Sequence, residues 1–184
     1  TFDNGISDEM FAKIVACIRI AVPYTGMIVS TRETKETREK VLKLGISQIS
    51  GGSRTSVGGY AKEEAPEDNS AQFDVSDNRT LDEVLHWLMT LGYVPSFCTA
   101  CYREGRTGDR FMELLKSRQI INCCHPNALM TLKEYLEDYA SPETKAVGEE
   151  LIARELKTIP NEKVRIKAQE YIDNIHLGKR DFRF

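Results

Sequence analysis

The sequence predicts an α/β fold at the start of the chain and an all-helical fold after it. Within the first 60 residues, helical patterns alternate with short apolar runs, which is the order of elements in βα units with a parallel sheet. From residue 80 onward, apolar residues recur at helical spacing in one segment after another. Residues 61–79 are acidic and contain Pro66, so we expect a surface linker between two domains.

The first part is predicted to hold two helices and two strands. The first helix runs from Ser7 to about Ile18. Residues 27–29 form a strand that is apolar throughout, as in a buried parallel sheet, and a helix over residues 35–44 leads to a second strand over residues 46–50. Two strands do not make a stable sheet alone. We therefore expect further strands in a missing N-terminal part, or association of the chain.

Polar residues gather where both predicted strands end. Ser30 and Arg32 follow the first strand, while Ser53 and Arg54 follow the second after two glycines. Functional groups of parallel α/β folds collect at the carboxyl ends of the strands. A guanidinium group there suits a substrate carboxylate or phosphate. A solvated arginine and an ordinary glycine turn are the simpler alternatives.

The part after the linker is predicted to be helical. The sequence from Thr80 to Glu83 has the pattern of a capping box, and Ser141 followed by Pro142 is typical of a helix start. The tail, residues 179–184, shows no clear structural pattern. We expect helices over residues 80–90, 108–116, 127–139, 141–158 and 162–177.

Three cysteines make the strongest chemical pattern. Cys98 and Cys101 form a Cys-x-x-Cys pair, and 22 residues separate Cys101 from Cys124. Such a pair brings two thiolates to one metal centre, and three thiolates leave one ligand position open, as in an iron–sulfur cluster with a reactive iron or in a catalytic zinc site. A redox pair and plain core thiols are the alternatives. Cys123 and Cys124 cannot easily both point at one centre, and His125 is a candidate fourth ligand.

The loop after the cysteine pair is basic, with Arg103, Arg106 and Arg110. Guanidinium groups near a three-thiolate cluster would offset its negative charge and tune its reduction potential. The alternative is a solvated loop in which Glu104 and Asp109 serve as ionic partners.

Composition narrows the class of protein. The chain is 41% hydrophobic and 29% charged, which is typical of a globular protein. A net charge of −3 gives no support for nucleic-acid binding, and the apolar runs are far too short for a membrane span. Five cysteines cannot all pair and no signal peptide is visible, so we expect free thiols in a cytoplasmic location.

These motifs together carry a resemblance to a known family. Residues 98–108 read CTACYREGRTG and, with Cys124, form a Cys-x2-Cys-x22-Cys pattern; residues 28–33 read IVSTRE and residues 50–60 read SGGSRTSVGGY. Over nearly its whole length the chain resembles the C-terminal portion of the HydG family, the radical SAM tyrosine lyases that mature the H-cluster of FeFe-hydrogenase. The related tyrosine lyase of thiamine synthesis shares the strand-end motifs but lacks the cysteine motif.

The resemblance implies a fold and a cofactor. It implies that residues 1–60 are the end of a radical SAM (β/α)8 barrel, that residues 61–79 are a linker, and that residues 80–184 are a helical C-terminal domain with an auxiliary cluster site. The ligands of that site are matched by Cys98, Cys101 and Cys124. The implied cofactor is a 4Fe-4S cluster whose open iron can be linked to a fifth, labile iron.

The resemblance also implies an activity for the parent protein. A 5′-deoxyadenosyl radical from S-adenosyl-L-methionine cleaves L-tyrosine to p-cresol and dehydroglycine. Dehydroglycine then yields carbon monoxide and cyanide on the iron of the auxiliary cluster. Ser30 and Arg32 match the region that holds the tyrosine carboxylate, and Ser53 lies in the other substrate-facing loop. Ser50 is a weaker candidate in the same region.

The chain departs from the family in one respect. It contains no Cys-x3-Cys-x2-Cys motif, which holds the SAM cluster in the family, and it lacks most of the barrel strands. We therefore expect the chain alone to be inactive and its partners to be the missing barrel half, other hydrogenase maturation proteins and a second copy paired through exposed strand edges. The competing hypothesis is a non-catalytic interaction module in which Cys98, Cys101, Cys124 and His125 hold a structural zinc ion.

Overall fold

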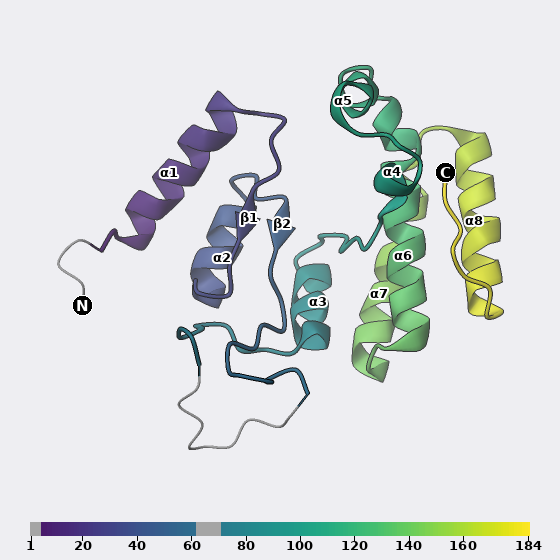
Figure 1. The fold of residues 1–184 in the computed structure, drawn as a ribbon. Coiled ribbons are helices and arrows are strands. Elements are labelled where there is room, and N and C mark those ends of the chain that lie inside the picture. The colour runs from purple at the N-terminus through teal and green to yellow at the C-terminus, as the bar shows by residue number, and fades with distance from the viewer. Residues whose placement is uncertain (1–4, 62–70) are drawn as a thin grey trace. The chain divides into compact units, whose positions relative to one another are not determined.

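The computed structural model describes residues 5–61 and 71–184, and the chain divides into two compact units, Thr1–Leu81 and Asp82–Phe184. Figure 1 shows the elements of each unit. Of the predicted linker over residues 61–79, the part from 62 to 70 lies outside the described residues. None of the helices that the structure describes combines the length and the apolar character that a membrane span requires.

The first unit alternates helices and short strands. Its elements are α1 (Asp8–Ala21), β1 (Ile28–Val29), α2 (Lys35–Leu42) and β2 (Gln48–Ile49). The two strands pair in parallel, with Ile28 opposite Gln48 and Val29 opposite Ile49. The predicted order and the parallel pairing are confirmed, but each strand is only two residues long. Further strands of a barrel stay a prediction.

Helix α1 buries a narrower face than its sequence predicts. Ala12 and Val15 are buried, whereas Ile14 and Ile18, which share the apolar stripe, are 40% and 43% exposed. Ser7 begins the helix as predicted, because its hydroxyl oxygen accepts the N–H of Met10 at 3.2 Å. The apolar stripe of α1 therefore remains partly open to solvent.

A buried arginine ties the end of the predicted linker to the first unit. Arg38 of α2 is fully buried, pairs with Asp77 and donates to the main-chain oxygen of Ser50. Arg79 donates to the same carboxylate at 2.6 and 2.8 Å. Burial alone would raise the pKa of Asp77, but the hydrogen bonds from Arg79 and the charge of Arg38 hold it below its ordinary value. Residues just before α3 are thus anchored against α2.

The second unit is helical, as the sequence predicts. Helix α6 begins at Cys124, three residues before its predicted start, and two short helices that the sequence does not predict interrupt the loops around it. The elements are α3 (Leu81–Thr90), α4 (Ala100–Arg103), α5 (Gly108–Lys116), the 3-10 helix η1 (Gln119–Asn122), α6 (Cys124–Asp138), α7 (Pro142–Leu156) and α8 (Glu162–His176).

The core of the second unit lies among α6, α7 and α8. Leu129 and Leu132 of α6 are completely buried, and Met89 of α3 joins the same cluster. Gly148 of α7 lets that helix approach α6 closely, because a Cβ atom at this position would lie 2.5 Å from a terminal carbon of Leu136. The remaining members of the cluster are Met130, Leu136, Leu151, Ile152, Leu156, Ile159, Ala168, Ile172 and Ile175.

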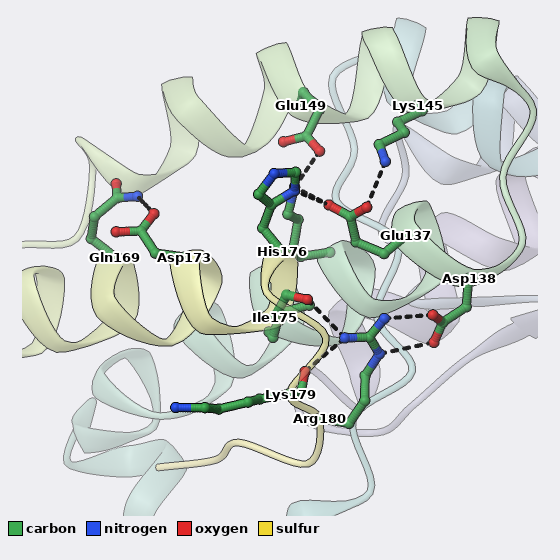
Figure 2. Close-up of polar contacts among 11 residues, drawn as sticks. Glu137, Asp138, Lys145, Glu149, Gln169, Asp173, Ile175, His176, Lys179 and Arg180 are labelled. Atoms are coloured by element: carbon green, nitrogen blue, oxygen red, sulfur yellow. Dashed lines mark hydrogen bonds and ion pairs between the residues drawn. The ribbon is translucent and has the colours of Figure 1, made fainter.

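Ionic contacts join the helices of this core, and Figure 2 shows several of them. The carboxylate of Glu137 accepts from Lys145 at 2.5 Å and from His176 at 2.9 Å, and it pairs with Lys133 at 2.7 Å. Burial would raise the pKa of Glu137, but these hydrogen bonds lower it to about 2. Glu137 therefore joins α6 to both α7 and α8.

The tail after α8 is packed, although its sequence shows no clear pattern. Arg180 holds Asp138 of α6 through two hydrogen bonds of 2.5 and 2.9 Å (Figure 2). The ring of Phe182 stacks on Tyr171 of α8 with the centroids 4.5 Å apart, and Phe184 lies 5.6 Å from the same ring. The tail thus runs back beside α6 and α8 toward α4 (Figure 1).

Candidate metal centre

The structure brings the three predicted cysteines to one pocket. Cys98 lies just before α4, Cys101 lies within it, and Cys124 is the first residue of α6. Together with Arg106 they line a pocket of about 400 Å³, called the cysteine pocket here. The other residues that line it are Ser96, Tyr102, Thr107, Gly108 and Phe111. The pair and the distant third thiol therefore face a common space.

Local backbone contacts hold the Cys-x-x-Cys segment in place. The N–H of Cys98 donates to the hydroxyl of Ser96 at 3.3 Å, and the N–H of Ala100 donates to the sulfur of Cys98 at 3.4 Å. The N–H of Arg106 closes the following turn by donating to the carbonyl of Cys101 at 2.8 Å. An N–H group aimed at a sulfur stabilises its thiolate form, which is the form that binds metal.

Cys124 has the most perturbed thiol of the group. Burial raises its pKa to about 12, and the neighbouring thiols of Cys123, Cys101 and Cys98 add to the rise. In the metal-free chain this thiol stays protonated at neutral pH, and a bound metal must displace its proton. Its place at the N-terminus of a 15-residue helix favours the negative charge that a bound thiolate cluster carries.

The two neighbours of Cys124 also make contacts outside the cysteine pocket. The thiol of Cys123 donates to the carbonyl of Ile120 at 3.4 Å. The Nε2 atom of His125 lies 3.4 Å from the carbonyl of Glu155 and 3.3 Å from the hydroxyl of Thr158. Neither Cys123 nor His125 is among the residues that line the cysteine pocket. A zinc site that uses His125 would require this side chain to leave its place beside α7.

Among the residues that the structure describes, the thiols do not have the arrangement of a single-ion site. Across residues 5–61 and 71–184, no three histidine, cysteine, aspartate or glutamate side chains are arranged to hold one metal ion. Tetrahedral zinc needs all its ligand atoms within about 2.3 Å of one centre, whereas a 4Fe-4S cluster binds its thiolates at separate irons. Three thiols around this pocket, with the cationic side chain of Arg106 among the lining residues, fit the larger anionic group.

The first unit places the predicted strand-end residues at one edge. Because Val29 pairs with Ile49, Ser30 and Ser50 leave the sheet side by side. The hydroxyl of Ser30 accepts the N–H of Arg32 at 3.2 Å.

The guanidinium of Arg32 lies 3.9 Å from the ring centroid of Phe73, a residue that the sequence analysis did not connect with it. Ser53 is half-buried in the loop that follows β2. No signal in the sequence links Phe73 to Arg32, since they are far apart in the chain and only the fold brings them together.

Comparison with known proteins places the chain in a family. Residues 1–94 match the model of the Biotin and Thiamin Synthesis associated domain. The chain belongs to this family. The match to this domain ends four residues before Cys98, so the cysteine pocket lies beyond it. No curated protein matches the chain.

The solved structures that are similar to this chain include two maturases. One is HydG, a maturase of the [FeFe]-hydrogenase: it is 51% identical over 100% of the chain, with a TM-score of 0.91. The other is the FeFe-hydrogenase maturase HydG from Carboxydothermus hydrogenoformans, which is 36% identical over 94% of the chain, with a TM-score of 0.66. The resemblance to HydG that the motifs predict is confirmed. The chain spans 39% and 35% of the lengths of these two proteins.

Proposed function

We propose that this chain is the C-terminal part of an FeFe-hydrogenase H-cluster maturase and that Cys98, Cys101 and Cys124 hold its auxiliary 4Fe-4S cluster. The observation that carries the proposal is the shared pocket: thiols separated by 22 residues of sequence meet there, in a chain 51% identical to HydG along its whole length. A pair of thiols alone would suit a redox or structural role equally well.

The surroundings of Cys98 and Cys124 prepare these two thiols for metal binding. Cys98 is held by the Ser96 hydroxyl and by the Ala100 N–H, and so enters the site with its sulfur already oriented. Cys124 gives up its proton to solvent when metal binds, at the positive end of α6. When bound, the cluster supplies one iron without a protein ligand, where a labile fifth iron with carbon monoxide and cyanide can be carried.

In the parent enzyme, a radical SAM lyase with a (β/α)8 barrel, the strand-end residues bind the substrate. Ser30 and Arg32 would hold the tyrosine carboxylate, because the guanidinium supplies the charge that a carboxylate needs. Ser53 would face the substrate from the other loop, and Ser50 is a weaker candidate in the same region. The 184-residue chain has no SAM cluster motif, so by itself it does not cleave tyrosine. Its partners are the barrel half with S-adenosyl-L-methionine and other hydrogenase maturation proteins.

Reconstitution of adjacent cysteine variants tests the cluster assignment. Anaerobic reconstitution of the wild-type chain should give about four irons and four sulfides per chain, and a cubane EPR signal after reduction. Cys124→Ser should lose most of the iron, because it removes a ligand. Cys123→Ser is the matched control and should keep it, because Cys123 does not line the cysteine pocket.

Replacement of His125 separates the cluster from the zinc alternative. His125→Ala should leave the iron content unchanged, because the imidazole contacts Glu155 and Thr158. One zinc per chain, lost together with the fold in His125→Ala, would overturn the cluster proposal and support a structural zinc module.

A further inference from the structure

Arg106 occupies a special position among the basic residues after Cys101. It lines the cysteine pocket and also a second pocket of about 580 Å³, which lies against the tail and is called the tail pocket here. Its Nη2 atom donates to the main-chain oxygen of Phe184 at 2.8 Å. Its Nε atom is buried and makes no hydrogen bond. Burying such a donor without an acceptor is unfavourable, so this position calls for a reason.

The two other arginines that follow Cys101 do not line the cysteine pocket. Arg103 is exposed, and its guanidinium forms a two-pronged ion pair with Asp181, in which one hydrogen bond measures 2.8 Å. Arg110 lines the tail pocket and not the cysteine pocket. Of the three arginines that the sequence offers, Arg106 is therefore the one that borders the thiols.

The tail holds the guanidinium of Arg106 through Phe184 and Asn127. The N–H of Phe184 donates to the Oδ1 atom of Asn127 at 2.9 Å, and the Nδ2 atom of Asn127 lies 3.5 Å from the Phe184 oxygen that receives Arg106. Asn127 is 3% exposed and lies in the first turn of α6, three residues after Cys124. The same turn of α6 thus carries a thiol of the pocket and the anchor of the tail.

Further contacts hold the tail beside the cysteine loop. Arg183 donates to Glu104 at 2.8 Å, and Asp181 receives Arg103. The main-chain N–H of Asp181 donates to Glu134 of α6 at 2.7 Å. Because these contacts join the tail to the residues that directly follow Cys101, a displaced tail would release Arg106 as well.

From these contacts we propose that Arg106 donates a hydrogen bond through Nε to the cluster held by the three cysteines and that the tail positions it through Phe184. The inference rests on the proposed function, because it assigns a residue to that cluster. A three-thiolate cluster is anionic, and reduction adds another negative charge. A nearby guanidinium that donates to a cluster sulfur stabilises the reduced state more than the oxidised state and so raises the reduction potential.

Redox titration of charge-matched variants tests the proposal. Arg106→Gln and Arg110→Gln each remove one positive charge, the first from the loop before α5 and the second from α5 itself, in chains reconstituted with iron and sulfide. EPR measures the reduction potential of each variant. Arg106→Gln should lower it by at least about 59 mV, which is a tenfold change in equilibrium for one electron. Arg110→Gln should change it by less than half as much. Arg106→Lys keeps the charge without the planar donor fork, and should recover only part of the shift.

Removal of residues 182–184 tests the part played by the tail. This truncation should shift the potential in the same direction as Arg106→Gln, and the two changes together should add nothing to the larger one. Fluorescence of Trp87, which is buried in α3, confirms that each variant is folded.

The outcomes separate the inference from the function on which it rests. Equal shifts in Arg106→Gln and Arg110→Gln would overturn the role of Arg106 while the cluster stands. A wild-type chain without iron and sulfide would overturn the cluster and the inference together.

Discussion

Different kinds of interaction stabilise the two units of this chain. The second unit, Asp82–Phe184, has a continuous apolar core among α6, α7 and α8, and its buried lysine, Lys133, pairs with two carboxylates, Glu137 and Glu149. In its described residues, 5–61 and 71–81, the first unit has two strands of two residues each and a fully buried ion pair between Arg38 and Asp77. It leaves Ile14 and Ile18 of α1 partly exposed.

The difference shows where each unit is vulnerable. Apolar packing is spread over many residues, so the loss of one contact in the second unit is shared among its neighbours. A buried charge depends on a single counter-charge, and removing that partner leaves the full desolvation cost in place. We expect single substitutions to be most damaging at the ion pair of the first unit.

The largest effect is expected from Asp77→Asn. It leaves the buried Arg38 guanidinium without its counter-charge, which should destabilise the first unit by about 3–5 kcal/mol. Trp87 is the only tryptophan and lies in the second unit, so its fluorescence follows that unit, while far-UV circular dichroism follows both. Urea titrations should show an early transition in circular dichroism alone. Asp74→Asn, an exposed change nearby, serves as control, and one unshifted transition in Asp77→Asn would contradict the comparison.

A smaller, pH-dependent effect is expected at Glu137. Its pKa is about 2 in the folded chain, below an ordinary value of 4.5, so its contribution to stability is complete above pH 4.5 and is lost as the pH falls toward 2. Glu137→Gln should cost at most about 3 kcal/mol at pH 7 and much less near pH 2. Urea unfolding at both pH values, followed by Trp87 fluorescence, measures this. Glu150→Gln is the exposed control, and a loss in Glu137→Gln that did not vary with pH would exclude the ionic explanation.

The smallest effect is expected from Gly148→Ala. The added methyl group would meet Leu136 at 2.5 Å inside the core, while alanine favours the helix by about 1 kcal/mol. Overpacking costs about 1–3 kcal/mol, so the net loss should be at most about 2 kcal/mol. Thermal unfolding compares this variant with Glu150→Ala on the exposed face of α7. A stabilised Gly148→Ala would mean that the core yields more readily than its packing suggests.

The sequence predicts the features that depend on local pattern. Ser7 and Ser141 cap their helices as expected, because a cap involves residues only three positions apart. The spacing of Cys98, Cys101 and Cys124 predicts a shared site, and the three residues line one pocket. The preference for Cys124 over Cys123 comes from the resemblance to HydG, since spacing alone leaves both open.

Sequence patterns do not predict the features that depend on contacts between residues far apart in the chain. Arg38 sits in a highly charged helix and reads as a solvated residue, but Asp77, 39 positions later, allows it to be buried. The tail has no periodicity, yet Asn127 and Tyr171 give it a defined place. His125 follows Cys124 directly, and only the position of Glu155 shows that its ring faces another way. In each case a contact between residues far apart in the chain overrides the local pattern.

The start of α6 at Cys124 has a consequence for the register of the whole helix. Each residue turns an α-helix by about 100°, so the five positions from Cys124 to Leu129 fix an angle as well as a length. A residue inserted between them would keep Leu129 in the core but would swing the thiol about a quarter of a turn around the axis. The core thereby acts as an angular reference for the site: helix phase, and not only the spacing of the cysteines along the chain, determines where the third thiol points.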